Sequence, residues 1–181
     1  MSAASDIAVQ PRRRAASRGL MVFLRLVQVF IALSAIAFIL IGLVFVIDNP
    51  VRAEFMEELG SEALLRRVGL TVFIGAAIAA AWYYVVELLI RVVRTVQNGD
   101  PFVEANIGRL RAMWIVVALT EVFRLVVHAG ANVAVNATSV TEAETGVDIR
   151  LSTIFLVVII AALSEAFRLG VELRRDAELT I

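Results

Sequence analysis

Four long apolar runs constrain this chain more than any other feature of its sequence. The first, from Leu26 to Ile47, contains no charged side chain, and at about 1.5 Å per helical residue it is long enough to cross a hydrocarbon core of about 30 Å. Of all 181 residues, 60% are hydrophobic and the mean hydropathy is +0.87. A soluble domain of this length does not bury so much apolar surface in one core. We therefore predict an integral membrane protein.

The runs predict an all-α integral membrane bundle of four transmembrane helices. We expect spans at about residues 24–47, 68–93, 112–135 and 151–170, within a membrane domain of residues 20–171. A basic arm, residues 1–19, precedes this domain, and a tail, residues 172–181, follows it.

The distribution of arginine predicts that both termini are cytoplasmic. The arm, the central turn and the tail hold Arg12, Arg13, Arg14, Arg18, Arg94, Arg109, Arg111, Arg174 and Arg175. The loops on the other side hold only Arg52, Arg66, Arg67 and Arg150. An excess of positive residues marks the cytoplasmic side of a membrane protein. In the first outer loop, residues 48–67, Pro50 and the spacing of Val51, Phe55 and Leu59 predict a short amphipathic helix on the membrane surface.

Signals for a tight turn separate the second and third spans. Asn98-Gly99 predicts the end of one helix, because glycine accepts the left-handed conformation found at helix C-termini. Asp100-Pro101 predicts the start of the next helix, with Asp100 as N-cap and Pro101 as the first helical residue. We expect this turn to be cytoplasmic.

Four polar residues interrupt the third span: Glu121, Arg124, His128 and Asn132. At 100° per residue they fall within about 80° of arc on one helical face. Glu121 is expected roughly 14 Å from the inner edge, near the bilayer midplane. A lone charge at that depth is costly, so this polar stripe must face protein or water.

The fourth span carries a similar pair, Glu165 and Arg168. The segments 118–125 and 162–169 agree at six of eight positions, which is a weak sign of duplication. We predict that Glu121 and Arg124 exchange partners with Arg168 and Glu165 across the two helices. Axial offsets of about 9 Å must be closed by long side chains or by a register shift.

Several classes of functional site are disfavoured by composition. The chain has no cysteine and a single histidine, His128, so thiolate sites and multi-histidine metal centres are excluded. No Gly-rich phosphate loop or Ser-His-Asp arrangement is evident, and a lone histidine without a nucleophile is a weak general base. We expect no enzyme activity, no metal, no cofactor and no direct contact with nucleic acid.

Two segments carry a family resemblance. They are Gln97-Asn98-Gly99-Asp100-Pro101-Phe102, followed by Asn106 and Arg109-Leu110-Arg111, and the closing stretch from Phe167 to Ile181. With them, residues 20–181 resemble the bacterial family called domain of unknown function 2975. The resemblance implies a four-span protein of the bacterial cytoplasmic (inner) membrane, without an assigned activity or known catalytic residues. Its relatives are often encoded beside a small helix-turn-helix regulator of the Cro type.

Two hypotheses for function follow, besides the expected contact with the lipid bilayer. The first is a non-enzymatic regulatory or signalling module whose cytoplasmic contact face binds a cytoplasmic regulator protein. We place this face at Asp100, Pro101, Phe102, Asn106, Arg109, Arg111, Arg174 and Arg175. Leu173, Leu179 and Ile181 would form an apolar edge that docks on the turn or on the partner, unless the tail simply caps the bundle.

The alternative is a small transporter, or a proton or ion channel, that uses the polar stripe of the third span. Four helices enclose little space, so this function would require a homo-oligomer. The same polar residues serve equally as a structural ion-pair clamp, which needs fewer assumptions.

Overall fold

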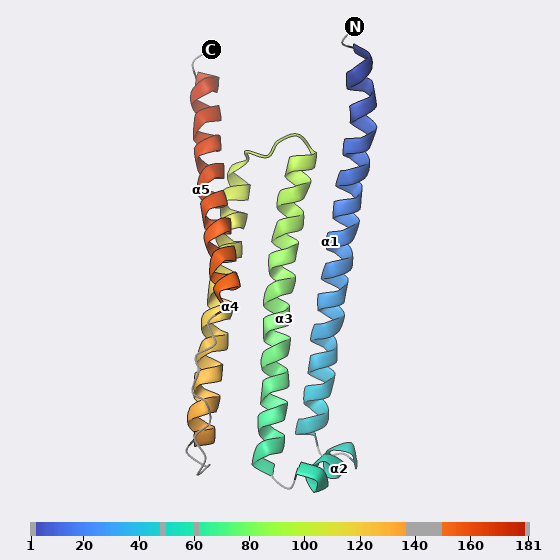
Figure 1. Ribbon diagram of the computed structural model, residues 1–181, viewed down its shortest axis with the longest axis vertical. Helices are drawn as coiled ribbons and strands as arrows, with labels where there is room; N and C mark the ends of the chain where they lie inside the picture. Colours follow the sequence, from blue (N-terminus) through green and yellow to red (C-terminus); the bar gives the residue numbers. More distant parts are fainter. Residues whose placement is uncertain (1–2, 48–49, 60–61, 137–149, 180–181) are drawn as a thin grey trace. The chain divides into compact units, whose positions relative to one another are not determined.

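The computed structural model describes residues 3–47, 50–59, 62–136 and 150–179, and these residues form helices and turns without any strand. The helices are α1 (Ala3–Val46), α2 (Pro50–Leu59), α3 (Glu62–Gln97), α4 (Glu104–Asn136) and α5 (Leu151–Leu179) (Figure 1). The all-helical class predicted from the sequence is confirmed.

Three stretches in the described part of the chain are long and apolar enough to cross a membrane. They are Arg18–Val46 in α1, Arg67–Gln97 in α3 and Leu151–Ala177 in α5. The helix α4, which contains the polar stripe, is not among them. These helices are those of a multi-pass membrane protein.

The chain divides into two compact units, Met1–Ile90 and Arg91–Ile181. In the first unit, α1 and the part of α3 up to Ile90 run antiparallel (Figure 1). Aromatic rings of one helix lie on glycines of the other: a Cβ built at Gly42 would lie 3.0 Å from Cζ of Phe73, and one at Gly75 would lie 3.6 Å from the Phe38 ring. Small residues therefore let these two helices approach closely, as in many membrane bundles.

In the second unit, α4 and α5 pack against each other as an antiparallel pair. Phe102 meets Gly170 near one end of the pair, and Glu121 meets Arg150 at the start of α5. This register places the first turn of α5 beside the middle of α4 (Figure 1). Beyond Glu121, α4 continues to Asn136. At the other end, α5 runs past the turn that precedes α4.

One face of α4 forms the buried core of the second unit. Asn106, Leu110, Met113 and Val117 are at most 4% exposed, and their spacing of four, three and four residues places them on one helical stripe. Glu121 continues this stripe by a further four residues. Glu121 and Arg124, two of the four polar residues predicted to share a face, therefore extend the buried face of α4 beyond its apolar part.

Local signals located two helix boundaries and misplaced a third. The predicted helix between the first two apolar runs is confirmed, and Pro50 is its first residue. The helix end at Asn98-Gly99 is confirmed as well, because α3 ends at Gln97. The predicted start of α4 at Asp100-Pro101 is wrong, because α4 begins at Glu104. Phe102 lies two residues before Glu104, and its ring packs on Gly170 of α5. We attribute the later start of α4 to this packing, which overrides the preference of Pro101 for the first turn of a helix.

Candidate functional site

The turn between α3 and α4 is held by backbone hydrogen bonds. Asn98 N–H donates to the Arg94 carbonyl oxygen and Asp100 N–H donates to that of Thr95, both at 3.1 Å. Gly99 has a φ of +85°, in the left-handed region that side chains with a Cβ adopt only at a cost. These bonds satisfy carbonyl groups that the end of α3 would otherwise leave unpaired.

Asn106 is the polar centre of this turn and is fully buried. Its Nδ2 donates to Thr95 Oγ1 at 2.6 Å and to the Pro101 carbonyl oxygen at 2.9 Å, and its Oδ1 accepts from Arg109 at 2.8 Å. One amide therefore joins the last turn of α3, the connecting segment and the first turns of α4. Because the Asn106 amide is buried, these hydrogen bonds stabilise the turn in the geometry described.

Phe102 joins the turn to α5. A Cβ built at Gly170 would lie 2.5 Å from Cδ1 of Phe102, so the aromatic ring lies directly on the α5 backbone. The Phe102 ring also packs against Phe167, with ring centroids 5.5 Å apart and an interplanar angle of 51°. Tilted packing at this separation is favourable for aromatic pairs.

An ion pair joins the same two segments nearby. Arg174 donates to Asp100 Oδ1 at 2.5 Å, and both side chains are about half exposed. We call this site the turn–tail junction and define it by Asp100, Phe102, Phe167, Gly170 and Arg174. The structure thus brings together the turn between α3 and α4 and the tail, which were separate parts of the predicted contact face.

The remaining predicted tail contacts differ from expectation. Leu173 and Leu179 are 71% and 78% exposed, so these two residues do not dock on the turn as an apolar edge. Ile181 lies outside the described residues. Arg111 and Arg175 are exposed, as a surface contact requires. The tail is attached through Arg174 and Gly170, one face of α5, and presents its leucines to the surroundings.

The polar stripe of α4 contains a bidentate ion pair. Arg124 donates to Glu121 through Nε at 3.2 Å and through an η nitrogen at 2.6 Å, and the two side chains are 16% and 14% exposed. The Glu121 carboxylate also interacts with Arg150, through its backbone N–H and the charge of its guanidinium. Glu121 therefore links the middle of α4 to the residue that precedes α5.

The second predicted pair lies on α5 and is more exposed. Arg168 donates to Glu165 at 2.5 Å and to Glu172 at 2.5 Å. The exchange of partners between Glu121–Arg124 and Glu165–Arg168 is therefore wrong, because each arginine binds a glutamate of its own helix. The register of the two helices explains this result. Glu121 lies level with the start of α5, and Glu165 is about 22 Å further along α5, a distance that no side chain can bridge.

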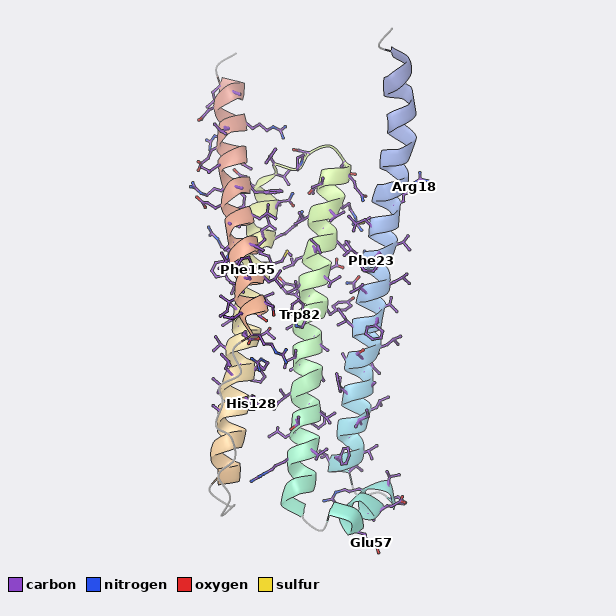
Figure 2. The ribbon with its side chains drawn as sticks, in the orientation of Figure 1. Arg18, Phe23, Glu57, Trp82, His128 and Phe155 are labelled. Carbon is purple, nitrogen blue, oxygen red and sulfur yellow. The ribbon has the colours of Figure 1, made fainter. Side chains whose placement is uncertain are left out.

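The structure places the last two residues of the stripe, His128 and Asn132, on the part of α4 beyond the start of α5. His128 is exposed there (Figure 2). Asn132 belongs to the same helix, but its side chain lies outside the described residues. In the described part of the chain, no group of three potential metal ligands gathers around His128 or elsewhere.

Sequence reasoning missed a polar cluster in the first unit. Gln28 Nε2 donates to Glu87 Oε2 at 2.9 Å, and Arg25 donates to Gln28 Oε1 at 2.6 Å. An ion pair of 3.4 Å also joins Arg25 to Glu87. Gln28 is 4% exposed, whereas the side chains of Arg25 and Glu87 are 48% and 24% exposed, so these bonds link α1 to α3 at the edge of their contact. The signal was a single amide side chain in the first apolar run, two residues after its start.

Searches for relatives gave no match: no protein-family model, no curated protein and no solved structure resembles the chain.

Proposed function

We propose that this protein is a non-enzymatic regulatory or signalling module of the bacterial cytoplasmic membrane. In this proposal the chain crosses the membrane four times, both termini are cytoplasmic, and the turn–tail junction presents a surface to a cytoplasmic regulator protein. The family assignment to domain of unknown function 2975 is part of the same proposal. It rests on the residues of the turn and the tail.

One observation carries the proposal: two segments far apart in the sequence form one surface. Asp100 pairs with Arg174, and Phe102 packs on Gly170. Both contacts lie at an end of the α4–α5 pair that is rich in arginine, which favours a cytoplasmic location. A half-exposed ion pair of this kind contributes little to stability. Because both side chains remain accessible, the pair is better suited to contact with a partner than to holding the fold.

A charge-swap experiment tests this proposal. A photo-crosslinking residue at Arg175, adjacent to the junction, is expected to capture a defined cytoplasmic protein in cells that express the full chain. Asp100→Arg should abolish this crosslink by repelling Arg174. The double variant Asp100→Arg with Arg174→Asp should restore it, because the pair is rebuilt with reversed signs.

The matched control is Glu104→Arg, an equal change of charge at an exposed position near the turn. It should leave the crosslink in place. Capture that is insensitive to Asp100→Arg would contradict a role for the junction, and so would a crosslink that the double variant fails to restore although the protein folds.

A further inference from the structure

The side of α5 that faces away from α4 carries a row of exposed apolar residues. We call this row the α5 seam and define it by its members: Phe155, Ile159, Ala162, Ala166, Leu169 and Leu173. All of them are exposed, and the four large side chains are 48–71% exposed. They follow one another at alternating intervals of four and three residues, which is the spacing of helices that pack as a coiled coil.

The opposite side of α5 has the same spacing and already packs on a helix. Ile160 and Ser164 are buried, at 8% and 7% exposure, and Phe167 follows three residues later and packs on Phe102. These positions lie about 200° around the helix from the seam. Within its own unit, α5 therefore has two faces with one repeat. One of them packs on α4, and the other is exposed.

Charged side chains border the seam in the last turns of α5. Arg168 binds Glu165 and Glu172, and these three side chains are 41–57% exposed. This end of α5 is rich in arginine, which favours an aqueous location, so Leu169 and Leu173 of a single copy would be exposed to water. A helix that packs on the seam buries both leucines, which is favourable, and leaves the ion-paired charges at the aqueous edge.

The charges beside the seam fit a second copy of this chain. Glu165 and Glu172 flank the seam on one side, and Arg174 flanks it on the other. Two copies in one membrane share an orientation, so a two-fold axis along the membrane normal brings the acidic flank of one copy to the Arg174 flank of the other. The glutamates of the two copies then lie on opposite sides of the contact, and Arg174 is half exposed and accessible to a second carboxylate.

The middle of the seam is suited to close packing of two helices. Ala162 and Ala166 lie one turn apart, and small residues at this spacing let helix backbones approach each other in a membrane. The large side chains of Phe155 and Leu173 lie at the two ends of the seam. The last turns of α3, residues 91–97, belong to the same unit as α5 and leave Leu169 and Leu173 exposed.

We propose that the α5 seam is the contact between two copies of this chain in a parallel dimer with two-fold symmetry. Each copy contributes the same six residues, and the helices approach most closely at Ala162 and Ala166. This inference goes beyond the proposed function and does not depend on any cytoplasmic partner at the turn–tail junction.

Single cysteines test the dimer, because the natural chain has none. Each variant of the full chain is expressed in two differently tagged forms and oxidised in native membranes. Isolation through one tag and detection of the other measures the disulfide-linked dimer. Ala162→Cys and Leu169→Cys should give about ten-fold more dimer than Ile154→Cys and Arg175→Cys, because disulfides form only where Cα atoms approach within about 7 Å. The last two positions are exposed on α5 away from the seam.

A bulky side chain in the middle of the seam provides a second test. Ala162→Phe should convert the detergent-purified protein from dimer to monomer, because the ring separates the helices where they approach most closely. Light scattering measures the mass, and circular dichroism confirms the helical fold. The matched control is Ala105→Phe, the same substitution at an exposed position of α4, which should leave the protein dimeric.

Two results would overturn the inference. One is equal disulfide formation at Ala162→Cys and at Ile154→Cys, which would mean that the copies meet by random collision or through another surface. The other is a mass in detergent that Ala162→Phe leaves unchanged, whether the natural chain is a monomer or a larger assembly. Neither result bears on the crosslink at Arg175 that tests the proposed function.

Discussion

The ring of Phe102 lies against the backbone of Gly170, with Cδ1 2.5 Å from the position that a Cβ would occupy. Gly170→Ala should therefore displace the ring and lower the free energy of unfolding by about 1–3 kcal/mol, as overpacking does. Chemical denaturation in detergent measures the change. Combining Gly170→Ala with Phe102→Ala removes the clash, so the glycine substitution should then cost little. An equal cost in both backgrounds would contradict the contact.

Asn106 should contribute more to stability than its small size suggests. Asn106→Ala leaves Thr95 Oγ1 and the Pro101 carbonyl without this buried partner. The loss is expected to lower the free energy of unfolding by about 1–3 kcal/mol. Asn98→Ala, at an exposed position of the same turn, is the matched control and should have little effect. Equal stability of the two variants would contradict the central role of Asn106.

Two glycines near the turn are expected to respond in opposite ways to alanine. Gly99 has a φ of +85°, so Gly99→Ala should destabilise the protein by about 1 kcal/mol. Gly108 lies inside α4 with open space around its missing Cβ, and there alanine should stabilise by about 0.5–1 kcal/mol. Thermal unfolding of both variants measures the difference. Stabilisation by Gly99→Ala would contradict the observed turn.

The link between α1 and α3 predicts energetic coupling between Gln28 and Glu87. A double-mutant cycle with Gln28→Ala and Glu87→Ala should give an interaction free energy of about 0.5–3 kcal/mol, the usual range for residues in one hydrogen-bond network. The control is a second cycle with Glu87→Ala and Ser152→Ala, because Ser152 is exposed and lies in the other compact unit. These two substitutions should be additive. Strict additivity of Gln28→Ala and Glu87→Ala would show that their bond is not formed in the membrane.

Much of the fold was readable from local signals in the sequence. Apolar runs predicted the long helices, Pro50 marked the start of α2, and Asn98-Gly99 marked the end of α3. Each of these features depends on a few neighbouring residues, because helix length and helix termini are set by local backbone preferences and capping.

The start of α4 and the register of α5 depend on contacts between distant residues. Phe102, two residues before α4, packs on Gly170 of α5, and Glu121 of α4 interacts with Arg150, the residue before α5. The equal spacing of Glu121–Arg124 and Glu165–Arg168 in the sequence suggested crossed pairs. The long offset between the two pairs along the helix axes depends on the packing of α4 against α5, and neighbouring residues in the sequence do not reveal it. The Gln28–Glu87 bond was missed for the same reason, as the two residues belong to different helices.

The two matching Glu-Arg pairs offer a comparison of their roles. Glu121 touches the start of α5 through Arg150, whereas Glu165 binds Arg168 on its own helix. Glu121→Gln should therefore lower the thermal unfolding midpoint in detergent clearly more than Glu165→Gln does, because Glu121 is mostly covered whereas Glu165 is 57% exposed and its interactions are screened by solvent. A larger effect at Glu165 would contradict the role assigned to Glu121.

The account depends most on the statement that the turn and the tail form one cytoplasmic surface. The direct measurement is a pair of cysteines, Asp100→Cys with Arg174→Cys, in the otherwise cysteine-free chain, treated in native membranes with a short bifunctional thiol reagent. The account predicts an intramolecular crosslink, together with labelling of each single cysteine from the cytoplasmic side alone. Labelling from the outer side, or a crosslink no more efficient than that of Asp100→Cys with Ala177→Cys, would contradict it.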